Sequence, residues 1–209
     1  MSRSDRLALA RQLLAEGKTR YETLKAVAET RVVDWECSDG PRFSLEPGRF
    51  LVWGTTRRGQ PKAVAPDALD KFDHAYGFDA EGRLVLTRVG GARPSQYQED
   101  FYEHSPDSVV EYRFEERTPK RLAGVCIYTH SNDPMLIVAI DAAHQRGRWA
   151  AFRYRYEGQR LVEATLLRGS PHGRQLDYRD FEYDDEGRLS AVWWRYPDGR
   201  REKIALARR

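Results

Sequence analysis

The sequence predicts a mainly β protein, a large antiparallel meander of consecutive hairpins that forms a curved sheet or an open barrel, with an N-terminal pair of helices. Three observations predict this fold. Apolar residues follow a helical period over residues 1–30, they alternate with polar residues over residues 31–209, and short turns join the alternating segments. Parallel strands would need long crossover connections, which the sequence does not offer. We therefore expect residues 1–209 to form one domain.

Two helices are expected in the N-terminal segment. The first begins near Ser4, a potential N-cap, and ends at Gly17, while the second begins at a capping-box pattern formed by Thr19 and Glu22. The apolar stripes are Leu7, Ala10, Leu13 and Leu14 in the first helix, and Tyr21, Leu24, Val27 and Ala28 in the second. The short connection is compatible with a helix-turn-helix that reads DNA. Because a strand follows directly and no third helix is present, we favour helices that close one end or face of the sheet.

The remaining chain is predicted to be strands, apart from a short helix at Pro66–Phe72. The expected strands are Arg31–Glu36, Phe50–Thr56, Leu84–Val89, Gln96–Glu103, Val109–Glu116, Leu122–Thr129, Met135–Asp141, Trp149–Tyr156, Leu161–Arg168, Phe181–Tyr183, Leu189–Tyr196 and Lys203–Leu206. The continuous apolar run Met135–Ile140 indicates a central strand that is buried on both faces.

Composition points to a cytoplasmic protein without membrane association. The longest apolar run is far shorter than the roughly 20 residues that span a bilayer, and no signal-type stretch follows Met1. The two cysteines, Cys37 and Cys126, lack a C-x-x-C partner and are expected to be reduced. The net charge is +3, and its basic surplus is C-terminal, because residues 142–209 hold 15 Lys/Arg against 10 Asp/Glu.

An internal repeat is the most specific signal in the sequence. Its copies are Tyr76–Leu84 (YGFDAEGRL), Phe181–Leu189 (FEYDDEGRL), the shortened Tyr154–Leu161 and the degenerate Tyr112–Leu122, and Tyr196–Arg200 repeats the turn chemistry. Aromatic residues two positions apart share one strand face, the acidic residue begins a turn, glycine accepts a positive φ, and Arg-Leu starts the return strand. Each copy is therefore predicted to be a hairpin, with Gly82 and Gly187 at positive φ.

The repeat resembles the YD repeat of the RHS family, whose units read approximately Tyr-Asp-x-x-Gly-Arg-Leu. In that family the repeats form β-sheet shells that can enclose toxin domains, within very large secreted or surface proteins. This chain is short and its copies are irregularly spaced, so a complete shell is not expected. The resemblance implies a hairpin-built sheet, and small cytoplasmic proteins with such hairpins are similar to immunity proteins that neutralise toxins from neighbouring bacteria.

No cluster of residues predicts a catalytic, metal or cofactor site. The five histidines are spread singly, without the spacing that places two on one helix face. The densest polar group, His130 with Asn132 and Asp133 near Cys126, could assemble a Cys-His site, but a mid-strand cysteine is more typical of a buried thiol. We therefore expect no catalytic residue, no bound metal and no cofactor.

Aromatic and arginine residues alternate along two C-terminal strands. Val192, Trp194 and Tyr196 share one strand face, which we expect to pack in the core. A partner surface on the opposite face is then predicted to consist of Trp149, Arg153, Arg155, Trp193 and Arg195, because Trp and Arg are frequent interface anchors. The alternative is a cross-strand ladder in which Glu111 and Glu115 neutralise Arg153 and Arg155.

Three functions remain open. The favoured one is a non-enzymatic protein-binding module, specifically a cytoplasmic immunity protein that neutralises a bacterial toxin. The second is a nucleic-acid or polyanion binder that would use the same Trp/Arg face and would lose affinity steeply with salt. The third is an enzyme or small-ligand-binding barrel, which would have a deep pocket lined with convergent polar groups.

Overall fold

Consecutive strands of this protein pair with each other from one end of the chain to the other. The structure is a computed structural model and describes residues 3–46, 50, 58–129, 135–140, 148–170 and 173–204. Within these residues the chain forms two helices and one sheet of 12 antiparallel strands, ordered β1 to β12 as in the sequence. The elements are α1 (Arg3–Gly17), α2 (Tyr21–Arg31), β1 (Asp34–Ser38), β2 (His74–Phe78), β3 (Leu84–Gly90), β4 (Tyr97–His104), β5 (Ser108–Phe114), β6 (Leu122–Thr129), β7 (Met135–Ile140), β8 (Trp149–Glu157), β9 (Arg160–Ser170), β10 (Gly173–Tyr183), β11 (Leu189–Arg195) and β12 (Arg201–Ile204).

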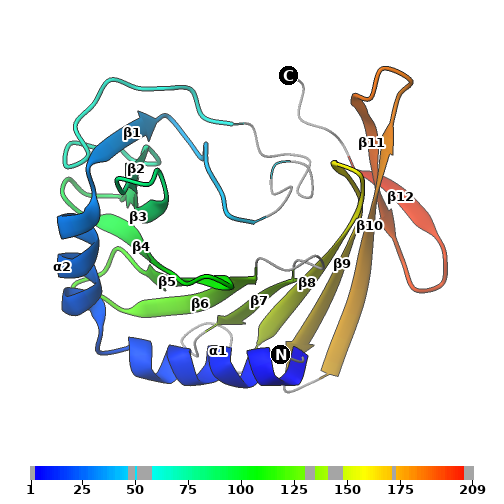
Figure 1. The fold of residues 1–209 in the computed structure, drawn as a ribbon, viewed down its shortest axis with the longest axis horizontal. Coiled ribbons are helices and arrows are strands. Elements are labelled where there is room, and N and C mark those ends of the chain that lie inside the picture. The colour runs from blue at the N-terminus through cyan, green and yellow to red at the C-terminus, as the bar shows by residue number, and fades with distance from the viewer. Residues whose placement is uncertain are drawn as a thin grey trace.

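The sheet is strongly curved and open, with β1 and β12 at its two edges (Figure 1). Both helices lie on the convex side, where α1 runs along β6 and β7 and α2 packs against β3 and β4. The segment that follows β1 runs over the concave side (Figure 1). The prediction of a mainly β meander with an N-terminal helix pair is confirmed. Neither helix in the described residues is long and apolar enough to cross a lipid bilayer.

Each face of the sheet carries its own hydrophobic layer, because successive side chains of a strand point to opposite faces. The concave layer includes Tyr76, Tyr102, Val109, Tyr128, Phe152, Tyr154, Phe181 and Val192. The convex layer includes Leu86, Phe101, Tyr112, Phe114, Leu122 and Val125 beneath Leu24 and Ala28 of α2, and Ile127 and Ala151 beneath Ala10 of α1. The helices therefore cover one face of the sheet. This agrees with the expectation that the helix pair closes one end or face of the sheet.

The second helix differs from its prediction at its start and along its stripe. The capping box does not form, since Arg20 precedes α2 without a side-chain cap and the Thr19 hydroxyl instead donates to the carbonyl of Glu16 at 3.4 Å. Val27 is 52% exposed. Of the four predicted stripe residues, Leu24 and Ala28 are fully buried, and Tyr21 is partly buried with its ring edge-on to Phe101 and Phe114 of the sheet.

Gly17 ends α1 as predicted, but for a different physical reason. Its φ is not positive, so it is not a left-handed helix cap. A Cβ atom at this position would lie 3.0 Å from side-chain atoms of both Tyr112 and Leu122. The absence of a side chain therefore lets the end of the helix approach the sheet closely.

Several strand boundaries also differ. Pro66–Phe72 forms turns and no helix, β2 (His74–Phe78) follows it, and β10 begins eight residues before the predicted Phe181. Arg31 belongs to α2, and β1 begins at Asp34. Met135–Ile140 is the seventh of the 12 strands described, in the predicted central position. Most of the expected strand Phe50–Thr56 lies outside the described residues, as do residues 141 and 205–206 of two others.

All four copies of the repeat form hairpins that share one irregularity. The strand pairing shifts immediately before the second aromatic residue of each copy, which is Phe78, Phe114, Tyr156 or Tyr183. Gly82 and Gly187 have φ angles of +71° and +78°, so their predicted backbone conformation is confirmed. The shared bulge is the structural counterpart of the sequence repeat, because a bulge re-aims the strand that enters the turn.

Candidate functional site

A cavity of about 140 Å³ lies on the concave face over β2 to β6. Its polar lining includes Ser44, His74, Thr87, Gln98, Asp100, Tyr102, Glu111, Arg113 and Tyr128. The segment that includes Pro41 and Phe43 covers it, held by a hydrogen bond from the backbone N–H of Arg42 to the Tyr76 hydroxyl at 2.8 Å. The Phe43 ring packs edge-on against Tyr76, with the ring centroids 5.0 Å apart.

The strand register brings these side chains together from distant parts of the sequence. Thr87 on β3 lies opposite Asp100 on β4, which lies opposite Arg113 on β5. In the adjacent row, Tyr102 on β4 lies opposite Glu111 on β5, and Glu111 lies opposite Cys126 on β6. Two neighbouring rows of the sheet therefore form the polar wall of the cavity.

Glu111 is the centre of the hydrogen-bond network in this wall. Its side chain is buried, and its carboxylate pairs with Nη2 of Arg113 at 2.8 Å. The hydroxyl of Tyr128 donates to the same carboxylate at 2.6 Å, and the hydroxyl of Tyr102 donates to its other oxygen at 3.1 Å. The Thr87 hydroxyl lies 3.2 Å from the Tyr102 hydroxyl and extends the network to β3.

The surroundings fix the protonation state of these groups. Burial alone would raise the pKa of Glu111, but the Arg113 charge and hydrogen bonds from Arg113 and Tyr128 hold that pKa below its usual value. Burial raises the pKa of the Tyr102 and Tyr128 hydroxyls and of the Cys126 thiol well above their usual values. At neutral pH the wall therefore contains an ionised Glu111, protonated tyrosines and a neutral thiol.

Cys126 fits the buried, unreactive thiol that its mid-strand position predicts. It is fully buried on β6, and a neutral thiol is a weak nucleophile. The other members of its predicted polar group, His130, Asn132 and Asp133, lie outside the described residues. Within the described part of the chain, no three His, Cys, Asp or Glu side chains are grouped closely enough to hold a metal ion.

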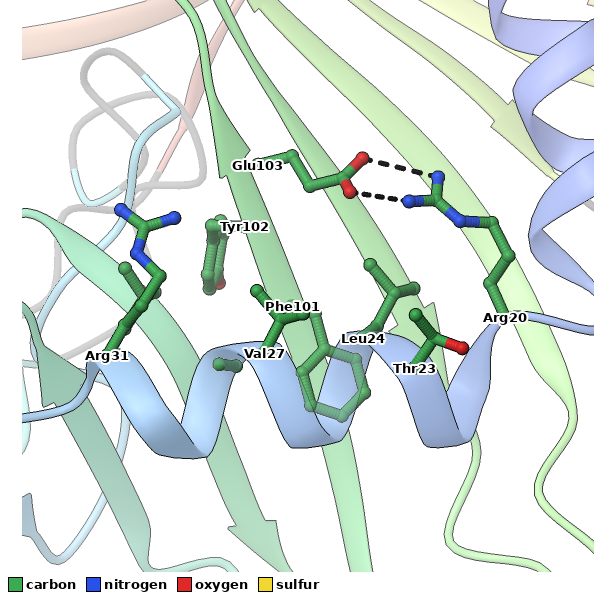
Figure 2. A pocket seen from close by; sticks show the side chains of 10 residues that line it. Arg20, Thr23, Leu24, Val27, Arg31, Phe101, Tyr102 and Glu103 are labelled. Atoms are coloured by element: carbon green, nitrogen blue, oxygen red, sulfur yellow. Dashed lines mark hydrogen bonds and ion pairs between the residues drawn. The ribbon is translucent and has the colours of Figure 1, made fainter.

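A second hollow, of about 40 Å³, lies between α2 and β4 (Figure 2). Leu24, Val27 and Phe101 supply its apolar lining, and Arg20 reaches Glu103 beside it with two hydrogen bonds of 2.5 and 3.3 Å. Such a volume is small beside the roughly 150 Å³ of a protein cavity that holds a benzene molecule. We therefore interpret it as a packing gap at the contact between helix and sheet.

The five residues predicted to bind a partner all lie on the convex face. Arg153 and Arg195 belong to one cross-strand row, and Arg155 and Trp193 belong to the next. Trp149 lies apart from them, because it packs with the hydrophobic cluster beneath α1. The structure thus places four of the five predicted residues in two adjacent rows of the convex face, with β9 and β10 between the arginines of β8 and the residues of β11. The fifth lies in the packing of a helix.

A charge ladder does form on this face, but with other partners than the sequence suggested. Nη2 of Arg195 lies 2.6 Å from Glu163, and its Nε lies 2.9 Å from Asp180. The predicted neutralisation of Arg153 and Arg155 by Glu111 and Glu115 is wrong. Glu111 faces the concave cavity, Glu115 pairs with Arg117 at 3.0 Å, and β5 and β8 are not neighbours in the sheet.

The two adjacent tryptophans of β11 point to opposite faces as predicted, but both are half-buried. Trp194 shares the concave face with Val192 and stacks on Tyr196, with the ring centroids 5.6 Å apart. Trp193 lies on the convex face, where the guanidinium of Arg201 is 4.8 Å from its ring centroid. Trp194 therefore lies on the same face as the core residue Val192, as predicted, but its side chain is half-buried and not fully buried.

Comparison with known proteins identifies no relative: no protein-family model, curated protein or solved structure matches this chain.

Proposed function

We propose that this protein binds a small polar molecule in the cavity on the concave face. The observation that carries the proposal is Glu111, an ionised carboxylate that is buried at the wall of the cavity and fixed by three different side chains. Ionised groups are expensive to bury, so a satisfied network of this kind next to a cavity is typical of a binding site. Small-molecule sites combine apolar walls with a few convergent polar groups.

The size of the cavity limits the ligand. A cavity of about 150 Å³ in a protein interior holds a molecule such as benzene. The 140 Å³ measured here is therefore suited to a ligand of roughly six non-hydrogen atoms. The neutral Cys126 thiol and the fully engaged Glu111 carboxylate favour binding over catalysis, because neither group is prepared to act as a nucleophile or a base.

Fragment screening by two-dimensional NMR tests this function. We expect small polar fragments to shift the backbone amide signals of Tyr102, Glu111 and Arg113 in the wild-type protein. The variant Val89→Trp fills the cavity from its rim, so it should remove these shifts, whereas Val33→Trp, at an exposed site away from the cavity, should retain them. Shifts that persist in Val89→Trp, or a diverse panel in which no fragment shifts these signals, would contradict the proposal.

A second function, protein binding, is favoured by the part of the convex face beyond the helices. The helices pack mainly over β3, β4, β6 and β7, whereas Arg153 and Arg155 on β8 are exposed and Trp193 on β11 is half-exposed. We propose that these three residues contact a protein partner that offers carboxylates, as expected for an immunity protein that binds a toxin.

Affinity purification followed by mass spectrometry tests the second function. We expect a protein that is recovered with the wild type and lost with the double variant Arg153→Ser/Arg155→Ser. The double variant Arg93→Ser/Arg117→Ser removes the same charge at other exposed sites and should retain that protein. Recovery of nucleic acid that is released steeply by salt would instead identify a polyanion binder.

A further inference from the structure

Arg179 is a buried arginine on the concave face of β10. It is 6% exposed, and its guanidinium carbon lies 4.0 Å from the ring centroid of Trp194 on β11. Its hydrogen bonding within the described residues is limited to one long contact, from Nη1 to the Tyr178 carbonyl at 3.5 Å, and it forms no ion pair with a carboxylate there. Charged groups are expensive to bury, so a buried guanidinium is expected to have an anionic partner.

The nitrogens of Arg179 that lack an acceptor form one edge of the guanidinium. Along this edge the N–H bonds of Nε and Nη2 are parallel and fit the two oxygens of a carboxylate. Arg195 on the neighbouring strand uses the edge in this way, with Nε 2.9 Å from Asp180 and Nη2 2.6 Å from Glu163. In Arg179 the same edge meets no acceptor in the described part of the chain, and Nε is fully buried.

The buried charges beside Arg179 do not neutralise it. Asp177 lies two residues earlier on the same face, but its Oδ1 accepts from Gln175 at 3.0 Å and its Oδ2 lies 3.8 Å from Nη1 of Arg168. Burial lowers the pKa of Arg179, Asp177 opposes this effect, and the charge of Arg168 adds to it. Two arginines therefore share one buried carboxylate.

The other charged groups near this end of the concave face are exposed. The Tyr196 hydroxyl donates to Glu202 at 2.8 Å, and the guanidinium of Arg200 lies 4.3 Å from the Tyr196 ring. Asp198 accepts from the backbone N–H of Arg200 at 3.0 Å in the following turn. Water and salt screen exposed charges, so these groups do not compensate a buried one.

We propose that Arg179 binds the carboxylate of a small monocarboxylate ion, which accepts hydrogen bonds from Nε and Nη2. This site lies on the concave face of β9 to β11, and its residues do not line the cavity over β2 to β6. Trp194 borders it, and the indole Nε1 of Trp194 is a second buried donor without an acceptor among the described residues. A single negative charge matches the uncompensated guanidinium, whereas the buried Asp177 would repel a doubly charged ion.

Three probes separate the roles of charge and shape. Acetate and acetamide have the same shape but differ in charge, and sulfate carries two negative charges. Binding is followed by NMR at constant ionic strength, through the indole N–H signal of Trp194 and the guanidinium N–H signals of Arg179. We expect acetate to bind in the millimolar range, at least about tenfold more tightly than acetamide or sulfate, because hydrogen bonds between two charged groups are the stronger ones.

Variants of Arg179 link this binding to the guanidinium. Arg179→Met should abolish acetate binding, and its melting temperature should not fall below that of the wild type, because the variant removes a buried charge that has no ion pair. Arg179→Lys keeps the charge but loses the parallel N–H edge, so it should weaken acetate binding by about fivefold or more. Arg174→Met makes the same change at an exposed site of β10 and should leave acetate binding unaltered.

A change at Asp177 should act in the opposite direction. Asp177→Asn removes the negative charge beside the site, so acetate should bind about threefold or more tightly than to the wild type. A purely structural role of Arg179 predicts no such gain.

Three results would overturn the proposal. The first is acetate binding that is no tighter than that of acetamide or sulfate. The second is acetate binding that persists in Arg179→Met or is equal in Arg179→Lys and the wild type, because the ion would then bind elsewhere. The third is a wild-type protein that does not bind acetate, which would mean that water satisfies Arg179. None of these results affects the cavity proposal, whose test observes Tyr102, Glu111 and Arg113.

Discussion

Asp79 and Arg83 are joined by three hydrogen bonds within a single hairpin turn. The Asp79 carboxylate accepts from the backbone N–H and from Nε of Arg83, both at 2.9 Å, and the backbone N–H of Asp79 donates to the Arg83 carbonyl at 3.0 Å. Asp184 and Arg188 repeat all three contacts, at 2.7, 2.8 and 2.9 Å. The Asp-x-x-Gly-Arg spacing of the repeat is therefore the spacing of one turn geometry.

The two aspartates should differ in their importance for stability, because their burial differs. The Asp79 side chain is 4% exposed and also pairs with Arg31 at 2.7 Å, whereas the Asp184 side chain is 30% exposed. We expect Asp79→Asn to lower the free energy of unfolding by about 2 to 3 kcal/mol and Asp184→Asn to lower it by clearly less. Urea titrations of both variants measure this, and equal losses would refute the role of burial.

The Asp79 carboxylate should also make the free energy of unfolding depend on pH in the acidic range. Burial by itself would raise the pKa of Asp79, but hydrogen bonds from Arg83 and Arg31 hold it far below its usual value. A lowered pKa stabilises the fold at pH values above about 3.9, the unfolded value, and this stabilisation is lost as the pH falls toward the folded value. Between about pH 5 and pH 2, the wild type should therefore lose more stability than Asp79→Asn. Parallel stability curves for the two proteins would contradict this.

A substitution at Gly82 should destabilise the protein because of the backbone conformation of this residue alone. Its φ is +71°, and an added Cβ would meet no atom within 4 Å. We expect Gly82→Ala to destabilise the protein by about 1 to 2 kcal/mol, the strain of a left-handed conformation. Gly40→Ala is the control, since the nearest atom to its Cβ is 3.7 Å away and its φ is not positive. A similar melting temperature for both variants would exclude backbone strain at Gly82.

The hydrogen bond from Tyr128 to the buried Glu111 should stabilise the fold more than the exposed hydrogen bond from Tyr196 to Glu202 does. Tyr128→Phe removes a donor from a buried carboxylate and should cost about 1.5 to 3 kcal/mol at pH 7. It should also raise the pKa of Glu111, so the difference from wild type should shrink in acid, when the carboxyl is protonated in both proteins. Tyr196→Phe removes a hydroxyl that donates to Glu202 at 2.8 Å in an exposed pair, and this change should lower the free energy of unfolding by clearly less than Tyr128→Phe does. Equal effects would argue against a special role for Glu111.

Local pattern was sufficient to predict the meander. Alternation and turn residues are properties of contiguous residues, so the hairpins around Gly82 and Gly187 were predictable from the sequence. The strand β2 was harder to predict, because its Tyr76 and Phe78 belong to the repeat but Gly77 interrupts the apolar pattern. A Cβ on Gly77 would lie 2.7 Å from Val32, so glycine is required there by the close approach of a neighbouring segment.

The cavity could not be predicted in the same way, because it depends on pairing between strands. Thr87, Tyr102 and Glu111 meet only through the register of β3, β4 and β5. The sequence does contain one signal, since Glu111 and Arg113 place two charges on a strand whose other residues are mainly apolar or aromatic. The alternation of Glu111 with Glu115 is also compatible with a cross-strand charge ladder, because alternation identifies two faces of a strand without showing that both are covered.

The two tryptophans of β11 lie on opposite faces of the sheet, so their variants probe the two faces separately. Trp194 covers the buried Arg179, whose guanidinium carbon lies 4.0 Å from the indole centroid, and burial lowers the pKa of that arginine. Trp194→Ala would admit water to this contact and should cost about 2 to 3 kcal/mol, less than the 3 to 5 kcal/mol for a fully buried aromatic residue, because the ring is half-exposed. Trp193→Ala loses the contact with Arg201 and should cost about 1 kcal/mol. If Trp193 also contacts a partner, Trp193→Ala should weaken association with that partner more than it weakens the fold. Urea titrations of both variants measure stability, and affinity measurements on both variants measure association. A Trp193→Ala protein that is as unstable as Trp194→Ala would show that the convex face at this position serves packing alone.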